Sequence, residues 1–460
     1  MDVDWKTHLE TYISANEGRF LEELKDWLRI PSISTLPEHA DDVRRAAEFA
    51  AEQLRQLGFD QVQLLATEGH PLVYGEWLKE AGKPMLLVYG HYDVQPVDPV
   101  ELWDSPPFEP TVRGDNLYCR GASDDKGQTM LILKAMESLV RVNGKLPVNV
   151  RVLLEGEEEA GGESIEHYVR TYPERLTCDT AFICDTGMPA KEIPALVYGL
   201  RGITYTEVEV HGAKRDLHSG EFGGIAPNPL HALALIIAGL KDAEGHINIP
   251  GLFDKVRQPT EAERTFWQSN PQGIEEVLKT EMGVSQFSGE NDYSALERVS
   301  ARPTLEVHGI SGGFIGEGAK TVIPAEAKAK ISLRLPSDLK SSEVFTLFEK
   351  RVQELAPRDV TVTVRNLHGG EAVLVDPDSR PMRAAIAALK ETYNQEPMLI
   401  REGGSIPIAS LFHEILHAPV VLMGFALPDD NLHAPNEKYS LTQFYKGLRT
   451  VANFLQKLGE

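Results

Sequence analysis

The hydrophobic pattern of the first 200 residues alternates between helical and strand-like periods. Apolar residues recur at helical spacing over the first 30 positions, where Pro31 ends the run, and again over residues 41–57, which Gly58 closes. A third helix is predicted over residues 128–142. Buried apolar strands that alternate with helices predict an α/β fold with a mostly parallel central sheet flanked by helices. The predicted strands are residues 61–65, 72–76, 85–89, 148–154 and 180–183.

The pattern changes near Arg201. Residues 204–211 alternate polar and apolar side chains, which is typical of a half-exposed antiparallel strand. A helix is predicted to begin at Pro229, and no element is assigned to the polar stretch 254–303. The next predicted elements are a strand over residues 327–335, a helix over residues 343–356 and a strand over residues 360–364. Together they indicate a smaller α+β domain.

The α/β pattern returns after Gly370. A helix is predicted over residues 380–393, a strand over residues 420–423 and a last helix over residues 441–458, where Ser440 and Gln443 would form a capping box. We therefore expect two domains. They are a discontinuous catalytic domain, residues 1–202 and 370–460, and an inserted lid or dimerisation domain, residues 203–369.

Composition and charge narrow the class of protein. The chain is 42% hydrophobic and 25% charged, which is ordinary for a globular protein, and its formal net charge of −23 argues against nucleic acid or membrane partners. The three cysteines form no C-x-x-C pair, which fits a reducing compartment. The N-terminus lacks the pattern of a signal peptide, and the longest apolar run, residues 232–240, is too short to span a bilayer. We expect a soluble, cytoplasmic protein.

Asp124 lies in the segment C-R-G-A-S-D-D-K-G, residues 119–127, between a short strand and a predicted helix. At a helix N-terminus the dipole and the free N–H groups favour a negative charge. A carboxylate held in this way can bridge two divalent cations if other ligands converge on it. Alternatively, Ser-Asp-Asp is an ordinary helix N-cap, which by itself is the more common arrangement.

Further metal-ligand side chains follow apolar strands. His91 and Asp93 follow one predicted strand, the acidic run of residues 155–159 follows a second, Asp185 follows a third, and His433 lies in a loop after a later strand. Because ligands in open α/β sheets bind at the carboxyl ends of strands, we expect these side chains at one edge of the sheet. Each alone is more often a solvated loop residue. Together with the carboxylate at the helix N-terminus they predict a metal site, with Asp93 orienting the imidazole.

These motifs resemble a known family. GHYDVQP, RGASDDKG, LEGEEEAGG, ICD and NLHAPNE closely match the dinuclear metallopeptidases that include carnosinases and cytosolic non-specific dipeptidases, which are relatives of aminoacylases and carboxypeptidases. The likeness continues through GLRGITYTEVEV, DLHSGEFGG, GAKTVIP, ISLRLP and EGGSIP, so it covers nearly the whole chain. Dispersed matches in the same order are highly specific.

The resemblance implies a role for each residue of the metal site. Glu158 would be the general base, and Asp93 would orient His91. The two roles within the acidic run are placed by their distance from Leu154-Glu155-Gly156. Five imidazole and carboxylate side chains would hold two divalent cations. One cation would be bound by His91 and Asp185, and the other would be bound by Glu159 and His433. Asp124 would bind both cations.

The resemblance also implies substrate contacts from the predicted lid. His218 would reach the site of the partner subunit in a homodimer and stabilise the oxyanion. Arg334 would bind the terminal carboxylate of the substrate through a bidentate pair, although such a residue is as often an exposed strand arginine. Thr321, Gly404 and Ser405 would complete the contacts to the carboxylate and the amide.

The implied chemistry is amide hydrolysis. Two metal ions about 3.5–4 Å apart can share a hydroxide and polarise a carbonyl, and a glutamate can complete the deprotonation near neutral pH. We expect hydrolysis of dipeptides or short peptides with a free C-terminal carboxylate. Ligands without thiolate suit zinc, manganese or cobalt. A deacylase or carboxypeptidase of the same family is the alternative, because the sequence does not identify the residues that select side chains.

A second motif points to a different class of peptidase. Residues 413–417 read H-E-I-L-H, the helical signature of mononuclear zinc peptidases. However, Pro419 follows at once and no G-x-x-H continues the motif. We therefore expect His413 and His417 on the surface of a short helix over residues 406–417, with Glu414 outside the active site.

Two further alternatives are weaker. Residues 313–321, GFIGEGAKT, nearly spell a phosphate-binding loop, but Ala319 separates Gly318 from Lys320. We interpret this segment as a substrate-facing turn of the lid. A catalytically inactive binding or scaffold protein on the same fold has no support, because every expected catalytic position is filled.

Overall fold

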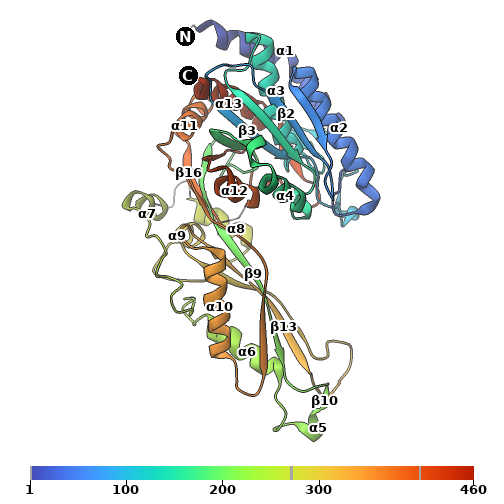
Figure 1. Cartoon of the computed structure of the whole chain (residues 1–460), viewed down its shortest axis with the longest axis vertical. Coiled ribbons are helices and arrows are strands. Elements are labelled where there is room, and N and C mark those ends of the chain that lie inside the picture. The colour runs from blue at the N-terminus through green and yellow to red at the C-terminus, as the bar shows by residue number, and fades with distance from the viewer. Residues whose placement is uncertain (1–2, 270–272, 404–405) are drawn as a thin grey trace. The chain divides into compact units, whose positions relative to one another are not determined.

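The structure is a computed structural model that describes residues 3–269, 273–403 and 406–460 (Figure 1). The chain divides into two compact units. Unit 1 comprises Met1–Tyr198, Val375–Ile400 and Leu411–Glu460, and unit 2 comprises Gly199–Leu374 and Arg401–Ser410. The segment Arg401–Ser410 lies in unit 2, whereas the sequence pattern placed these residues in the discontinuous catalytic domain.

Unit 1 is built on a mixed β-sheet with the strand order β1-β2-β6-β3-β7-β17-β8. Its four central strands are parallel: β6 (Asn149–Glu155), β3 (Met85–His91), β7 (Thr180–Ile183) and β17 (Val420–Leu422). Nearly every residue of β3 and β7 is buried, as expected for parallel strands covered on both faces. The α/β class predicted from the sequence is therefore confirmed. Antiparallel pairing flanks the centre, through β1 (Asp60–Leu65) and β2 (Leu72–Trp77) on one side and β8 (Ala195–Leu200) on the other. Strand β16 (Met398–Glu402) also pairs with β8, and the last two residues of β8, which belong to unit 2, pair antiparallel with β15 (Val373–Leu374).

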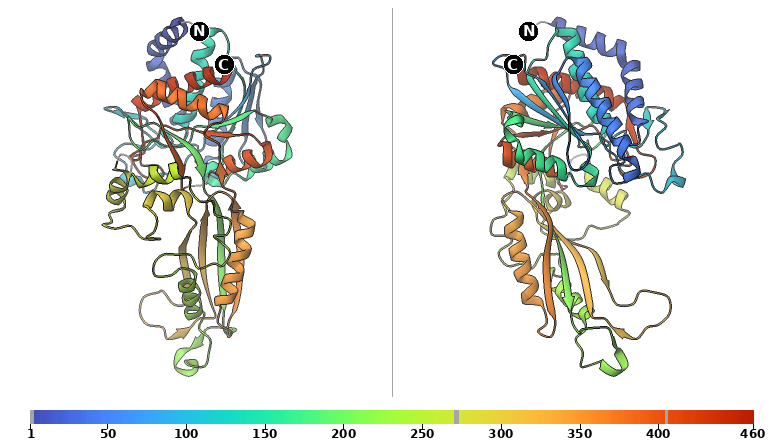
Figure 2. Two further views of the ribbon diagram at one scale, coloured as in Figure 1. Left: turned by 90° about the vertical axis from the view of Figure 1, so that its left-hand side faces the viewer. Right: turned by 45° about the vertical axis from the view of Figure 1, so that its right-hand side comes forward.

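Helices cover the sheet of unit 1 (Figures 1 and 2). The longest are α1 (Val3–Leu28), α2 (Ala40–Leu57), α3 (Lys126–Asn143), α11 (Arg380–Tyr393) and α13 (Leu441–Gly459), and a shorter one is α4 (Glu163–Thr171). Helix α3 packs against α1 and α13, and every residue in its first 14 positions is buried. Gly58 and Gly144 end α2 and α3 in the left-handed conformation. The helix that follows Asp124 is thus fixed within the core.

The predicted capping box of α13 forms only in part. The Ser440 hydroxyl accepts the N–H of Gln443 at 3.3 Å. The Gln443 side chain does not reach back to Ser440, because its amide nitrogen donates to the Lys191 carbonyl and its oxygen accepts from the Tyr393 hydroxyl. Packing against α11 therefore takes precedence over the local capping pattern.

A small three-stranded sheet in unit 1 joins distant parts of the chain. Strand β5 (Asn116–Tyr118) pairs with β4 (Thr111–Arg113) on one side and with β18 (Lys438–Ser440) on the other. The segment before Asp124 therefore lies beside the segment after His433.

Unit 2 contains a four-stranded antiparallel sheet in the order β11-β13-β9-β14. Its strands are β11 (Thr304–Gly312), β13 (Glu326–Leu335), β9 (Gly202–His211) and β14 (Thr361–Gly370). Helices α6 (Pro229–Leu240) and α10 (Ser341–Leu355) pack on it. A separate two-stranded ribbon is formed by β10 (Leu217–His218) and β12 (Val322–Ile323), and a short helix, α5 (Ser219–Phe222), follows β10.

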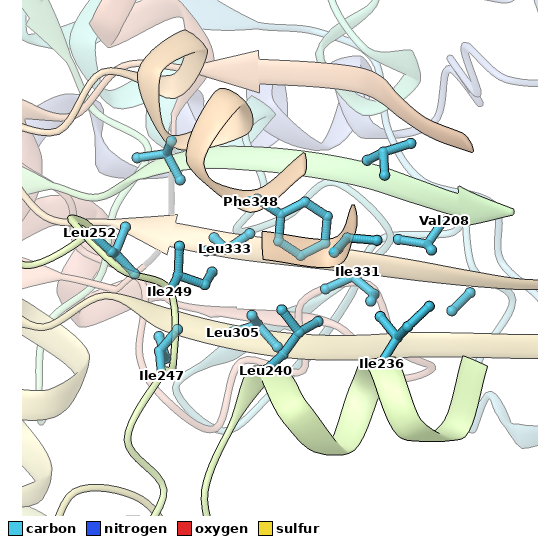
Figure 3. Close-up of a cluster of buried hydrophobic side chains, with 14 of the residues drawn as sticks. Val208, Ile236, Leu240, Ile247, Ile249, Leu252, Leu305, Ile331, Leu333 and Phe348 are labelled. Carbon is cyan, nitrogen blue, oxygen red and sulfur yellow. The ribbon is translucent and has the colours of Figure 1, made fainter. Parts of the chain in front are cut away.

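The hydrophobic core of unit 2 lies between strands and helices that are far apart in sequence (Figure 3). Alternate residues of the strands face it, among them Val208 and Ile331, because successive side chains point to opposite faces of a sheet. Ile236 and Leu240 from α6 and Phe348 from α10 complete the cluster.

The described residues of the polar stretch 254–303, for which the sequence pattern predicted no element, include three α-helices. These are α7 (Glu261–Gln268), α8 (Ile274–Met282) and α9 (Ala295–Ala301). Two of them begin with a complete capping box, Thr260 with Glu263 and Ser294 with Glu297. The S/T-x-x-E signature was present in the sequence and could have located both helices.

Two further observations concern the whole described chain. Among the described residues, no helix combines the length and the apolar character that crossing a membrane requires. Cys119, Cys178 and Cys184 are free thiols.

Candidate metal centre

The ligand-type residues predicted from the sequence meet at the carboxyl ends of the parallel strands of unit 1. His91 is the last residue of β3, Asp185 lies two residues beyond β7, and Glu159 lies in the short 3-10 helix η3 (Glu158–Ala160) after β6. Because β6, β3 and β7 are parallel neighbours, their ends lie at the same edge of the sheet. Asp124 comes from the loop before α3, and His433 comes from the loop before β18.

Two groups of potential ligands share Asp124. In the first, His91 Nε2 lies 3.1 Å from Asp124 Oδ1 and 3.8 Å from Asp185 Oδ2. In the second, His433 Nε2 lies 2.9 Å from Asp124 Oδ2 and 3.4 Å from Glu159 Oε2. Within each group the ligand atoms all lie within 4.8 Å of one another. Each oxygen of the Asp124 carboxylate thus faces a different group, which is the arrangement that a bridging ligand requires.

The alternative role for Asp124, an ordinary helix cap, does not match its contacts. The N-cap residue of α3 is Asp125, and no side chain caps the helix. The Asp125 carboxylate instead accepts hydrogen bonds from the His91 N–H at 3.2 Å and the Thr129 hydroxyl at 2.7 Å. Asp125 therefore ties the start of α3 to the end of β3, and Asp124 remains available to the imidazoles.

Asp93 links both groups of ligands. Its side chain is fully buried, and Oδ1 lies 3.3 Å from His91 Nδ1, on the opposite side of the ring from Nε2. The other oxygen, Oδ2, accepts the N–H of Glu159 at 3.1 Å. The hydrogen bond of Nδ1 is made with the main-chain carbonyl of Asp93 at 3.2 Å, so both the carbonyl and the carboxylate of Asp93 lie on the Nδ1 side of the ring and Nε2 faces Asp124.

The glutamates of the acidic run have different surroundings. The Tyr89 hydroxyl donates to Glu155 at 2.5 Å, and Glu157 Oε1 accepts the N–H of His70 at 3.1 Å, so each binds a group outside the two ligand groups. Glu159 contacts His433 and accepts a hydrogen bond from Gln95 Nε2 at 2.7 Å. Burial raises the pKa of Glu158 to about 7, the charge of His91 opposes this, and the neighbouring carboxylates reinforce it. Glu158 is thus a half-buried carboxyl close to the ligand groups.

The electrostatics of the site favour positive charge. Hydrogen bonds to Asp124 and Glu159 raise the pKa of His433 to about 10. Burial alone would raise the pKa of Asp124, but hydrogen bonds from His433 and His91 outweigh it and hold that pKa below its usual value. Burial, reinforced by the charges of Asp125 and Asp124, raises the pKa of Asp185 well above its usual value. The carboxylates therefore produce a negative potential that favours the binding of protons or metal ions.

The residues fit a pair of divalent cations. Each group offers one imidazole nitrogen and carboxylates, a donor set typical of zinc and manganese sites. Asp124, Asp185 and Glu159 have side chains that are 13%, 17% and 3% exposed, whereas His433 is 54% exposed, so the second group can be reached from solvent. A third group of ligand-type side chains, Glu209, His211 and Glu326, lies in unit 2. There Lys328 and Arg365 already neutralise Glu209.

The predicted substrate-binding residues that the structure describes belong to unit 2. His218 is exposed and accepts the N–H of Gly220 at its own Nδ1. Thr321 is exposed beside it, and its carbonyl accepts the N–H of Ser219, so both lie at the same two-stranded ribbon. Arg334 lies on β13, partly buried, where it pairs in register with residues 203 and 304. The two remaining predicted residues, Gly404 and Ser405, lie outside the described residues.

The H-E-I-L-H motif does not form the helix that a zinc peptidase requires. Residues Phe412–Leu416 form a π-helical turn, and His417 has the left-handed φ of 54° that ends it. His413, Glu414 and His417 are all exposed, and none of them belongs to a group of potential ligands in the described part of the chain. The expected surface position of this motif is therefore observed, although the helix is π-helical at this point rather than a regular α-helix.

Two supporting residues were missed by reasoning from the sequence. Gln95 binds the carboxylate of Glu159, and Glu437 binds the backbone around Asp124. Both stand in the motifs GHYDVQP and NLHAPNE, but a glutamine and a lone glutamate in loops carry no spacing that would reveal these contacts.

Comparisons with known proteins identify the family of the chain. The model of peptidase family M20/M25/M40 matches residues 87–457. The Cys-Gly metallodipeptidase DUG1 of Candida albicans is 34% identical, covering 96% of this chain and 95% of its own. The human Beta-Ala-His dipeptidase is 31% identical, covering 98% of this chain and 92% of its own.

Solved structures show the same fold over the full length. The dipeptidase Dug1p of Saccharomyces cerevisiae is similar with a TM-score of 0.83 and 29% identity, covering 100% of this chain and 99% of its own. The M20 family metallo-carboxypeptidase Sso-CP2 of Sulfolobus solfataricus is similar with a TM-score of 0.85 and 34% identity, covering 96% of this chain and 99% of its own. The resemblance inferred from the motifs is thereby confirmed, and the chain belongs to peptidase family M20/M25/M40 as a metallopeptidase.

Proposed function

We propose that the protein is a dinuclear metallodipeptidase that hydrolyses the peptide bond of dipeptides with a free C-terminal carboxylate. The observation that carries this proposal is the Asp124 carboxylate, whose two oxygens face two separate groups of imidazole and carboxylate ligands. His91 and Asp185 would hold one cation, and Glu159 and His433 the other. Glu158, a half-buried carboxyl with a raised pKa, stands beside both groups.

The relatives support dipeptides as the substrate class. The two curated relatives named above are described as acting on Cys-Gly and on Beta-Ala-His, and each matches nearly the whole of this chain. Cys-Gly and Beta-Ala-His are both dipeptides with a free carboxylate and a small or flexible first residue. We infer that this chain accepts substrates of the same kind.

The residues of unit 1 would perform the acid–base steps. When bound, a pair of divalent cations supplies Lewis acidity for the carbonyl and favours deprotonation of water near neutral pH. Asp93 would hold the His91 ring in place through its main-chain carbonyl and its carboxylate, which both lie beside Nδ1. Glu158 accepts the proton of the attacking water and then delivers it to the leaving amine, for which a pKa near 7 is well suited.

Residues of unit 2 would recognise the substrate. Arg334 would bind the terminal carboxylate in a bidentate pair, and Thr321 with the Gly404–Ser405 loop would contact the carboxylate and the amide. His218 would stabilise the oxyanion, acting on the site of a partner subunit in a homodimer. Donors of this kind contribute about 10²–10³ in rate. The exposed position of His218 and Thr321 at one ribbon is consistent with both being offered to a ligand.

We further propose that the ions are zinc, manganese or cobalt and that the protein functions in the cytoplasm. Imidazole and carboxylate donors without thiolate suit these three metals. The free thiols Cys119, Cys178 and Cys184 fit a reducing compartment.

A carboxypeptidase is the second candidate, because Sso-CP2, described as a metallo-carboxypeptidase, is as similar as the dipeptidases. Substrate length separates the two functions. The metal-reconstituted protein should be assayed with Cys-Gly, β-Ala-His, matched tripeptides and N-acyl amino acids. Turnover confined to dipeptides supports the proposal, efficient release of the last residue from longer peptides supports a carboxypeptidase, and turnover of N-acyl amino acids alone supports a deacylase.

The same assay tests the H-E-I-L-H alternative. Glu414→Gln should leave dipeptide hydrolysis intact, because this side chain is exposed and lies 3.7 Å from Arg170 rather than beside any ligand group. Loss of activity in Glu414→Gln together with full activity in Glu158→Gln would replace the dinuclear site by a mononuclear zinc site.

A further inference from the structure

A buried carboxylate outside the ligand set binds the backbone that carries Asp124. Glu437 has no exposed surface, and its Oε1 accepts the N–H groups of Ser123 at 2.9 Å and Asp124 at 3.2 Å. Its Oε2 accepts the N–H of Gly121 at 2.9 Å and the guanidinium of Arg120 at 2.7 Å. Each oxygen therefore accepts two hydrogen bonds, and three of the four donors are main-chain groups of one short segment.

Further contacts join the same two segments. The carbonyl of Glu437 accepts the N–H of Cys119 at 3.1 Å, which continues the pairing of β18 with β5. Asp430 accepts the Ser123 hydroxyl at 3.0 Å and is itself bound by Lys438 at 3.2 Å. The loop that contains His433 is thus bound on both sides of the histidine to the segment before α3.

The segment between β5 and α3 depends on these contacts for its course. It contains no helix or strand of its own, and Gly121 has a left-handed φ of 82°. Glu437 lies four residues after His433 and bonds directly to the N–H of Asp124. One side chain therefore fixes the distance between the two loops that bring the Asp124 carboxylate to within 2.9 Å of the His433 imidazole.

We propose that Glu437, paired with Arg120, is a positioning residue of the metal centre: it holds the 121–124 backbone so that Asp124 can serve both groups of ligands. This inference rests on the proposed dinuclear site. An ionised carboxylate suits the task because it only accepts hydrogen bonds and offers about four acceptor positions. A glutamine of the same shape would turn an NH₂ group towards two of the four donors, and it would leave the buried Arg120 without its counter-charge.

Cobalt binding to the full-length, metal-free chain tests this role. Glu437→Gln should weaken Co²⁺ affinity about 10- to 100-fold, the usual effect of removing a group that supports metal ligands, and should change the visible absorption of the bound ion. Hydrogen–deuterium exchange should accelerate within residues 121–124, because the N–H groups of Gly121, Ser123 and Asp124 donate to the Glu437 carboxylate.

Glu290→Gln is the matched control. Glu290 forms another buried pair with an arginine, at 2.6 and 2.8 Å from Arg302, but it lies in unit 2 and touches no proposed ligand. Both substitutions leave a buried guanidinium unpaired, so both should lower the melting temperature. Only Glu437→Gln should alter Co²⁺ affinity, the absorption spectrum and exchange at residues 121–124.

A conservative variant covers the case in which Glu437→Gln does not fold. Glu437→Asp keeps the charge pair but shortens the side chain, so it should fold and bind Co²⁺ more weakly than the wild type, by a smaller factor than Glu437→Gln. Wild-type Co²⁺ affinity, spectrum and exchange in a folded Glu437 variant would overturn the positioning role. Wild-type protein that binds two ions but hydrolyses no dipeptide would instead refute the proposed function, and the positioning role would stand.

Discussion

Removal of the Asp124 carboxylate is expected to abolish stabilisation by both metal ions at once. One oxygen of Asp124 belongs to the group with His91 and the other to the group with His433. Asp124→Ala therefore leaves each group with two of its three ligand side chains. Asp185→Ala removes a ligand from the first group only, which makes it the matched comparison.

The size of the effect follows from binding linkage. An ion that binds only the folded protein, supplied at 100 times its Kd, stabilises it by about 2.7 kcal/mol, so two independent ions contribute about 5 kcal/mol. For a folding unit of roughly 250 residues, each kcal/mol moves the melting temperature by about 2–4 °C. Saturating metal should raise the Tm of the wild type by about 10–20 °C. Asp185→Ala should retain about half of that rise, and Asp124→Ala should retain almost none.

Differential scanning calorimetry with and without Mn²⁺ measures this rise. Each variant is compared with its own metal-free form, so that any effect of the substitution on the metal-free protein cancels. Metal content by elemental analysis should follow the same order, with two ions per chain in the wild type. A metal-induced rise in Asp124→Ala as large as in the wild type would show that Asp124 bridges nothing, and the dinuclear assignment would fail.

Four further predictions address the acid–base group, the pH dependence, the substrate clamp and the core of unit 2. Glu158→Gln should lower kcat about 10²- to 10⁴-fold with both ions retained, while Glu157→Gln, whose carboxylate bonds to the N–H of His70, should stay active. Since the pKa of Glu158 is raised to about 7, kcat/KM should fall as the pH drops below about 7 and the base becomes protonated; a profile flat down to pH 5 would contradict this role. Arg334→Ala should raise KM for free dipeptides far more than for C-terminally amidated ones, and an equal rise would remove the carboxylate clamp. Phe348→Ala should lower the free energy of unfolding by about 3–5 kcal/mol in urea titrations, because the side chain is fully buried, whereas a loss below about 1 kcal/mol would mean that the core around it is loosely packed.

Local patterns in the sequence predicted most of the regular elements. The amphipathic run over residues 41–57 with Gly58 at its end became α2 (Ala40–Leu57), and the apolar run over residues 180–183 became β7. Periodicity succeeds here because the face of a helix or strand that is buried must be apolar in any compact fold. It failed over residues 254–303, where each helix spans only seven to nine residues, too few turns for a helical period to stand out.

Tertiary packing overruled local signals in two places. Gln443 stands at the right distance from Ser440 for a capping box, but the Lys191 carbonyl and the Tyr393 hydroxyl bind its side chain instead. Residues 413–417 spell a helical zinc motif, but the turn becomes π-helical and His417 leaves the helix, because the chain must enter β17 soon afterwards. A motif that fits one element of structure carries its function only if the packing allows that element to form.

The sequence by itself determined which side chains could act and where along the strands they stand. The acidic and imidazole residues follow apolar strands whose parallel pairing brings their ends to one edge, and this was predictable from the pattern alone. Only the tertiary structure decided that Asp124 and His433, 309 residues apart, approach to 2.9 Å, and that Glu437 binds the backbone between them. The physical reason is that loops have no periodicity of their own. Their course is set by hydrogen bonds to buried groups from distant segments, and those partners exist only once the chain has folded.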